Sequence, residues 1–169
     1  IYGSLLSSQT CLDYNPVTNL LMNTFRGDPV TPGYLTGNDV VNGFSVDNGN
    51  TWELKKGFTG STADRCRYPV GVIFNPEGNT DVNNAYSVVA GPVTPGSGWA
   101  KTYLGSRKFD GGNVNEQRFN LTNEELFRNG ADVTSNGIFM VGNTYTNDNA
   151  DCKMNFYRGV FNGTTNSFD

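Results

Sequence analysis

The chain has 169 residues, with 16 acidic and 12 basic side chains and a formal net charge of −4. This acidic balance, without a cluster of Lys and Arg, argues against nucleic acid or an anionic membrane surface as a partner, and no apolar run is long enough for membrane insertion. The sequence contains no histidine, which excludes Ser-His-Asp or Cys-His catalysis by this chain alone and disfavours a zinc centre. We expect no metal and no cofactor.

The composition is typical of a turn-rich β protein. Glycine occurs 21 times, aromatic residues make up 12% of the chain, and asparagine is abundant. Such chains favour short strands joined by tight turns. The length suits one domain with a substantial core, and neither a linker nor a low-complexity segment divides it. We therefore predict a single all-β domain.

The first third of the chain predicts four strands. They cover residues 5–12, 18–25, 40–46 and 52–55. A turn signal over residues 13–16 separates the first pair, and a loop containing Pro and Gly follows the second strand over residues 27–37. We expect these strands to form one up-and-down antiparallel sheet within residues 1–58.

The remaining sequence predicts two more groups of strands. Within residues 68–120, strands are expected at 70–74, 85–90, 99–109 and 114–119, with connections at 57–69, 75–79 and 91–98. Thr122 followed by Glu125 fits a capping box, so a short helical turn is expected at residues 123–128. Strands at 137–142 and 154–161 then begin a third, incomplete group within residues 136–169.

One short stretch has the residues of a tight β-hairpin. In Ser45-Val46-Asp47-Asn48-Gly49-Asn50-Thr51-Trp52, the Asn-Gly pair supplies the positive φ angles that two-residue hairpin loops require. The carboxylate of Asp47 can accept hydrogen bonds from loop N–H groups. Ser45 and Thr51 can add hydroxyl bonds, and Trp52 can pack over the turn. An ordinary Asn-Gly hairpin is the alternative.

This stretch resembles the Asp-box, or BNR repeat, of sialidase-like β-propellers, because each defining position is filled, by Ser45, Asp47, Gly49, Thr51 and Trp52. The resemblance implies a sialidase-like β-propeller of four-stranded antiparallel blades, here a partial one. Residues 1–58, 68–120 and 136–169 would each form a blade, the last incomplete. In that family the box is a structural staple that lies away from the ligand-binding end.

Other phrases resemble the propeller regions of large secreted or surface proteins of bacteria that use type IX secretion. They lie at residues 13–16, 25–27, 67–76, 85–94 and 98–99. This resemblance implies a secreted or cell-surface location and a non-catalytic binding or adhesion role toward a glycan or a protein. The partners would be the remainder of the propeller or another chain at open sheet edges, a glycan, or the secretion machinery. A structural scaffold, or a fragment of a secretion-system cargo protein, is an alternative.

A sialidase-type glycoside hydrolase is the competing function. Such enzymes resemble this chain in fold and in the box, and they need three arginines for a substrate carboxylate, an Asp acid/base and a Tyr activated by a Glu. Arg26, Arg67 and Arg118 are the candidate arginines, and Asp39 is the candidate acid. The family's first arginine precedes the first box, whereas Arg67 follows it here, so we assign no catalytic residue.

Five residues are candidate ligand-binding positions: Arg26, Asp39, Arg67, Trp99 and Tyr103. Aromatic rings with Asn and Asp neighbours suit stacking on sugars, and Tyr34, Tyr68 and Tyr145 also lie near predicted loops or strand ends. Core packing between blades is the alternative for the aromatic residues. The alternative for the arginines is pairing on the surface, and for Asp39 it is a role in a turn or cap.

The cysteines Cys11, Cys66 and Cys152 have wide spacing that matches no metal motif. Cys11 lies in an apolar, strand-like stretch and is expected to be a buried thiol. Cys66 and Cys152 lie in polar contexts, so we expect any disulfide to join these two. Three buried thiols are the alternative.

Overall fold

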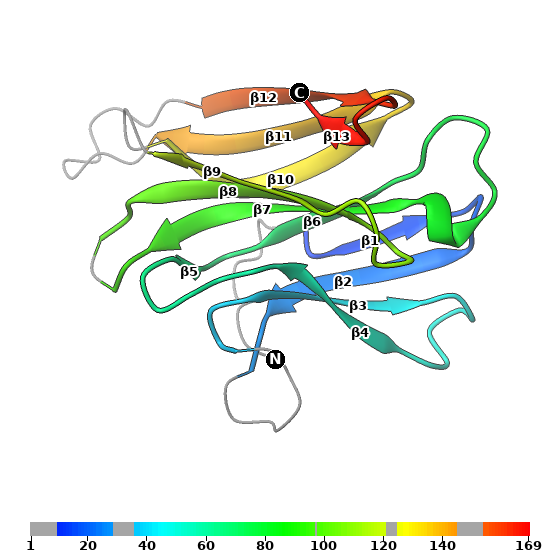
Figure 1. The fold of residues 1–169 in the computed structure, drawn as a ribbon, viewed down its shortest axis with the longest axis horizontal. Helices are drawn as coiled ribbons and strands as arrows, with labels where there is room; N and C mark the ends of the chain where they lie inside the picture. Colours follow the sequence, from blue (N-terminus) through cyan, green and yellow to red (C-terminus); the bar gives the residue numbers. More distant parts are fainter. Residues whose placement is uncertain (1–9, 29–35, 97, 121–124, 145–153) are drawn as a thin grey trace.

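The computed structural model describes residues 10–28, 36–96, 98–120, 125–144 and 154–169. These residues form an all-β fold of three antiparallel sheets, with one short 3-10 helix, Val82–Asn84. The sheets lie on one another in chain order, with the first sheet at the bottom of Figure 1 and the third at the top. Across the described ranges they do not close into a ring.

The first sheet is the predicted up-and-down unit, with strand order β1-β2-β3-β4. Its strands are β1 Leu12–Asn15, β2 Leu20–Arg26, β3 Val40–Ser45 and β4 Glu53–Phe58. The prediction of a turn at residues 13–16 was wrong, because these residues form most of β1. The turn begins later, since the side chain of Asn15 accepts hydrogen bonds from the N–H groups of Val17 and Thr18 at 3.2 and 3.1 Å.

The middle sheet contains β5 Arg65–Cys66, β6 Val70–Phe74, β7 Tyr86–Thr94, β8 Lys101–Lys108 and β9 Asn115–Asn120. Both β5 and β6 pair with β7, on the edge of β7 that faces away from β8. Tyr68, whose φ is 43°, lies between β5 and β6 and separates the two strands. The sheet therefore has four strand positions. The predicted loop at residues 91–98 was wrong in its first half, because pairing with β5 and β8 extends β7 to Thr94.

The third sheet contains β10 Glu125–Thr134, β11 Gly137–Thr144, β12 Met154–Asn162 and β13 Ser167–Phe168, in that order. The predicted helical turn at residues 123–128 was wrong, since Glu125–Arg128 belongs to β10, and Thr122 lies outside the described residues. The pairing of β10 with β11 outweighs the weak local preference of a capping box for a helical turn. The sheet thus begins before the predicted start at residue 136.

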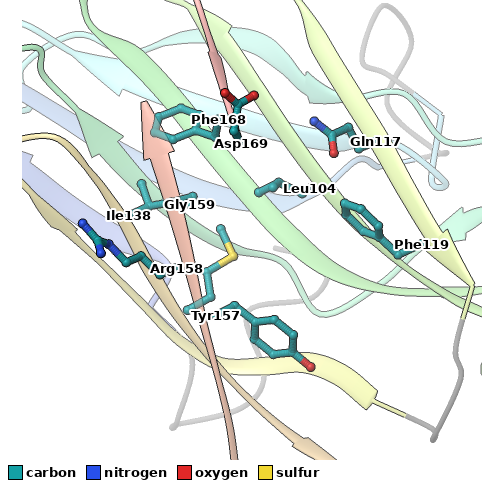
Figure 2. Close-up of a pocket in the computed structure, with 10 residues that line it drawn as sticks. Leu104, Gln117, Phe119, Ile138, Tyr157, Arg158, Gly159, Phe168 and Asp169 are labelled. Atoms are coloured by element: carbon teal, nitrogen blue, oxygen red, sulfur yellow. The ribbon is translucent and has the colours of Figure 1, made fainter. Parts of the chain in front are cut away.

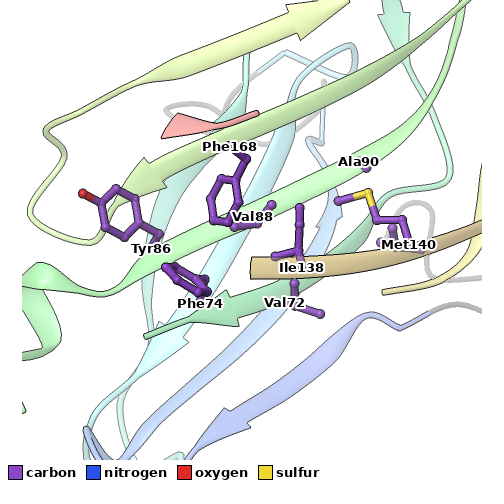
Figure 3. Close-up of a cluster of buried hydrophobic side chains, with 9 residues drawn as sticks. Val72, Phe74, Tyr86, Val88, Ala90, Ile138, Met140 and Phe168 are labelled. Atoms are coloured by element: carbon purple, nitrogen blue, oxygen red, sulfur yellow. The ribbon is translucent and has the colours of Figure 1, made fainter. Parts of the chain in front are cut away.

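The two faces of the middle sheet are buried against the two other sheets. One face, with Ile73, Val89 and Tyr103, packs on the first sheet at Met22, Val40, Phe44 and Phe58. The opposite face packs on the third sheet (Figure 3), where its residues Val72, Phe74, Tyr86 and Val88 meet Ile138, Met140 and Phe168. The ring of Phe74 lies edge-on to that of Phe168, with centroids 5.1 Å apart. Continuous cores on both faces fix the order of the layers.

One edge strand of each sheet lies along a common line. Gly71 N–H of β6 donates to the carbonyl of Thr10 at 2.9 Å, next to β1. Ile73 N–H donates to the carboxylate of Asp13 at 2.7 Å. Ala131 N–H of β10 donates to the hydroxyl of Thr10 at 3.3 Å. The sheets therefore converge at β1, β6 and β10, while β4, β9 and β13 are their outer strands.

A helix that could cross a lipid bilayer, long and apolar enough for the task, does not occur among the described residues.

Candidate functional site

The hairpin between β3 and β4 is built as its residues predict. Asn48 and Gly49 have φ angles of 61° and 84°. The carboxylate of Asp47 accepts hydrogen bonds from the Thr51 N–H at 2.9 Å, the Thr51 hydroxyl at 2.6 Å and the Ser45 hydroxyl at 2.7 Å. These bonds, from Thr51 first and then Ser45, lower the pKa of Asp47 to about 2. Asp47 is therefore a hydrogen-bonded anchor of the turn.

Trp52 closes the same turn. Its indole N–H donates to the carbonyl of Gly49 at 3.0 Å, so the ring lies against the turn. The Ser45 hydroxyl also accepts the Gly49 N–H at 2.9 Å. The defining residues of the stretch therefore bond mainly to one another, and a ligand is not needed to explain them.

The opposite ends of these strands carry most of the candidate ligand-binding residues. The segment 37–39 lies there between two sheets: Gly27 N–H donates to the carbonyl of Asp39 at 3.0 Å, and Cys66 N–H donates to that of Asn38 at 3.0 Å. The guanidinium of Arg67 donates to the carbonyl of Gly37 at 3.3 Å. These bonds bring the end of β2, with Arg26, close to β5 and Arg67.

Three arginines gather at this end. The pKa of Arg67 is lowered, first by burial and then by the positive charges of Arg26 and Arg65. Arg67 also donates to the carbonyl of Cys66 at 2.8 Å, and Arg65 donates to that of Thr62 at 3.1 Å. Within the described residues, neither Arg65 nor Arg67 forms an ion pair with a carboxylate. This end therefore gathers positive charge, and Arg67 is partly desolvated there.

Two aromatic rings adjoin the arginines. Tyr68 follows Arg67 directly and has a positive φ of 43°. Its ring lies 5.7 Å from that of Trp99, centroid to centroid, and both side chains are half-buried. We call Arg65, Arg67, Tyr68 and Trp99 the arginine–aromatic site. Sequence reasoning missed Arg65, although in an extended segment residues two apart, such as Arg65 and Arg67, lie on one face.

The prediction that Tyr103 is an exposed ligand-binding ring was wrong. Its side chain is fully buried against Phe58, with ring centroids 4.7 Å apart, and burial raises the pKa of its phenol. Tyr103 lies opposite Gly91 in the β7–β8 pair, and a Cβ on Gly91 would lie 2.6 Å from the Tyr103 hydroxyl oxygen. The missing side chain at residue 91 makes room for this ring inside the sheet stack.

Asp39 and Arg118 are held in other interactions. Asp39 is only 2% exposed; it accepts the Gly60 N–H at 2.7 Å and pairs with Lys56 at 3.4 Å, which fits the alternative of a turn or cap role. Arg118 pairs with Asp64 at 3.6 Å and lies over the ring of Phe58 at 4.6 Å. The structure thus gathers Arg26 with Arg67, whereas Arg118 is paired with Asp64, in the connection before β5.

The predicted disulfide is not formed by Cys66, which has a free and fully buried thiol. Burial is the main cause that raises its pKa to about 12. Cys11 is also a free thiol, half-buried. Cys152, Tyr34 and Tyr145 lie outside the described residues. In the part of the chain that the structure describes, no group of His, Cys, Asp and Glu side chains could hold a metal ion.

Comparison with models of protein families finds no match for this chain. Searches of curated proteins and of solved structures also find no match.

Proposed function

We propose that this chain is a non-catalytic binding module of a secreted or cell-surface bacterial protein, and that it binds an acidic glycan at the arginine–aromatic site. The observation that carries the proposal is the positive charge of Arg65 and Arg67, which meets only backbone carbonyls among the described residues. A ligand carboxylate would supply the missing anion.

The chemistry of the site favours a carboxylated sugar over other anions. A guanidinium offers a planar fork of donors that matches a carboxylate in two parallel hydrogen bonds. The adjoining rings of Tyr68 and Trp99 offer apolar faces on which a sugar ring can stack. Because Arg67 is already partly desolvated, an ionic bond formed there is screened less by water and salt than one on an open surface.

The architectural part of the proposal is a sialidase-like propeller. Its support is threefold: each sheet has four strand positions, the sheets follow one another face to face in chain order, and one edge strand of each, β1, β6 and β10, lies along a common line. The bonded Asp47 hairpin lies at the end opposite to the arginine–aromatic site, as the resemblance implies for the box. Further blades, or another chain at the open edges, would complete such a propeller.

A binding role fits the geometry better than sialidase-type hydrolysis. Asp39, the candidate acid, is buried and paired with Lys56, so it already has a partner. A pure scaffold is the remaining alternative, and it would bind no glycan.

The test compares acidic sugars with neutral counterparts. Digalacturonic acid is measured against its methyl ester, which differs only at the carboxylates, and sialyllactose against lactose, which lacks the sialic acid residue, by calorimetry at low salt. We expect binding of at least one acid and of neither neutral partner. Arg67→Ala is expected to weaken this binding about tenfold or more, which is a loss of about 1.4 kcal/mol.

Lys108→Ala is the matched control, because it removes one positive charge at the opposite end of β8, where Lys108 bonds to Asn84. It should leave affinity unchanged. Equal losses of affinity in Arg67→Ala and Lys108→Ala would mean that net charge alone causes the effect, and would refute the site. Hydrolysis of sialyllactose would instead favour the enzyme.

A further inference from the structure

β5 and the residue after it have a different neighbour on each edge. On one edge, the Cys66 N–H donates to the carbonyl of Asn38, and on the other the Arg67 N–H donates to the carbonyl of Pro92 in β7, both at 3.0 Å. The segment 37–39, which adjoins the first sheet, therefore lies on one side of β5, and β7 lies on the other.

The two guanidinium groups of the arginine–aromatic site lean toward these different neighbours. That of Arg67 donates to the carbonyl of Gly37 at 3.3 Å, on the side of the first sheet. That of Arg65 lies against Gly96, just beyond the end of β7, where a Cβ would be 3.7 Å from its Nη1. The Nε–H of Arg65 donates to the carbonyl of Thr62 at 3.1 Å. The two side chains therefore diverge.

This divergence creates two anion positions. Cα atoms two residues apart in an extended segment are about 6.6 Å apart, and side chains that lean apart separate the charges further. A carboxylate accepts two parallel hydrogen bonds from the fork of one guanidinium, so it binds either Arg65 or Arg67. Among the described residues, neither Nη2 group has an acceptor. Each arginine can therefore take a carboxylate of its own.

The two rings of the site lie beside both positions. Tyr68 directly follows Arg67, and Trp99 belongs to the same connection between β7 and β8 as Gly96, which contacts Arg65. The ring centroids are 5.7 Å apart. The ring pair therefore joins the segment of one arginine to the segment that holds the other, and it offers an apolar surface for the sugar rings that connect two acid groups.

The cavity between the middle and third sheets has a different chemistry. Its volume is about 330 Å³, and Figure 2 shows Leu104, Phe119 and Tyr157 around it, together with Arg158 and Asp169. Among the described residues that line it, Arg158 has the sole guanidinium, and the carboxylate of Asp169 repels an acidic ligand. Two acid groups therefore find no matching pair of cations in this cavity.

We propose that the arginine–aromatic site recognises an oligosaccharide that carries an acid group on more than one sugar, such as an oligouronate. The proposal deepens the proposed function and depends on it. Arg65 and Arg67 bind carboxylates of different sugars, and the rings of Tyr68 and Trp99 stack on the sugars. A ligand with one acid group fills one position only. Linking two ionic contacts in one ligand raises affinity, because the second contact forms at a high effective concentration.

The test is a length series on the unmodified chain. Galacturonic acid, digalacturonic acid and trigalacturonic acid are titrated by calorimetry at low salt. A single anion position would gain only the statistical factor of three equivalent acid groups, whereas two positions should lower the dissociation constant about tenfold or more from monomer to trimer. A smaller gain overturns this proposal. The proposed function then still stands if the acids bind and their methyl esters do not, and it fails too if no acid binds.

Arg65→Gln separates the second ionic contact from any other contact of a longer sugar. It keeps much of the stem and removes the charge, so the gain from monomer to trimer should disappear. Arg158→Ala and Lys108→Ala each remove one positive charge outside the site and should keep the gain. A gain that persists in Arg65→Gln, or that is lost equally in the two controls, overturns the proposal.

The salt dependence of the gain decides the case if Arg65→Gln does not fold. Ionic contacts are screened by salt, so the gain from monomer to trimer should shrink as the salt concentration rises. A gain that is independent of salt would come from stacking alone and would overturn the proposal. Binding of tetraglutamate as tight as that of trigalacturonic acid would make an acidic peptide the ligand and would also overturn it.

Discussion

The carboxylate of Asp47 accepts both the backbone N–H and the hydroxyl of Thr51, at 2.9 and 2.6 Å. Because these bonds favour the ionised form, the pKa of Asp47 falls from 3.8 to about 2. A lowered pKa in the folded state stabilises the fold above the unfolded pKa, and this contribution disappears as the pH falls through the folded value.

We therefore predict that Asp47→Asn lowers the melting temperature at pH 7, and that its deficit relative to the unmodified chain shrinks between about pH 4 and pH 2. Thermal melts followed by circular dichroism across this range check it. Glu77→Gln, in the exposed turn after β6, is the control and should show no comparable deficit. A deficit of the same size at pH 2 and pH 7 would contradict the role of the ionised carboxylate.

Tyr103→Phe should leave the free energy of unfolding unchanged or raise it by up to about 1 kcal/mol. The buried Tyr103 hydroxyl has no hydrogen-bond partner among the described residues, so its removal relieves a desolvation cost. Tyr86→Phe is the matched comparison, because the Tyr86 hydroxyl donates to Asn166 at 3.0 Å; it should cost about 1 kcal/mol. Urea denaturation of both variants checks this, and the reverse order would be incompatible with the hydrogen bonding described.

The thiol of Cys66 should resist N-ethylmaleimide in the folded chain and react only on unfolding. The thiolate is the reactive form, and burial raises the pKa of Cys66 to about 12 from 9.0. The same shift stabilises the fold below about pH 9, and this contribution is lost as the pH rises toward 12. Peptide mapping by mass spectrometry gives the labelling rates. Cys11, which is partly exposed, should react first; equal rates would count against the buried position of Cys66.

Phe74→Ala should destabilise the fold by about 3–5 kcal/mol, the usual range for a fully buried phenylalanine. Its ring packs on those of Tyr86, Phe161 and Phe168, so the substitution leaves a cavity between the middle and third sheets. Phe139→Ala, on the outer face of the third sheet and 41% exposed, should cost less than about 1 kcal/mol. Chemical denaturation separates them, and similar losses would mean that the two sheets do not share this core.

Local chemistry made part of the fold predictable. The hairpin at Asn48-Gly49 follows from the backbone angles that only a few residues tolerate, and Val70–Phe74 follows from a continuous apolar run bounded by turns. In contrast, β10 has a polar start with a capping signal. Its strand conformation depends on pairing with β11, which no local pattern encodes.

The arginine–aromatic site was predictable only in pieces. Arg26 and Arg67 were candidates, but their proximity depends on segment 37–39, which bonds to both sheets. Tyr103 is a tyrosine in a strand, and its local sequence does not distinguish it from an exposed aromatic residue. Its burial depends on Gly91 in the neighbouring strand, a relationship that appears only once the register is known.

The most direct test of the account follows the arginine side chains themselves. In a two-dimensional NMR titration with sialyllactose or digalacturonic acid, the Nε–Hε signals of Arg65 and Arg67 and the indole signal of Trp99 should shift together and saturate. The signals of Arg107 and Arg158, which lie outside the site, should stay in place. Shifts confined to Arg158, or unchanged Arg65 and Arg67 signals at saturating acid, would contradict a carboxylate-binding site at this end of the sheets.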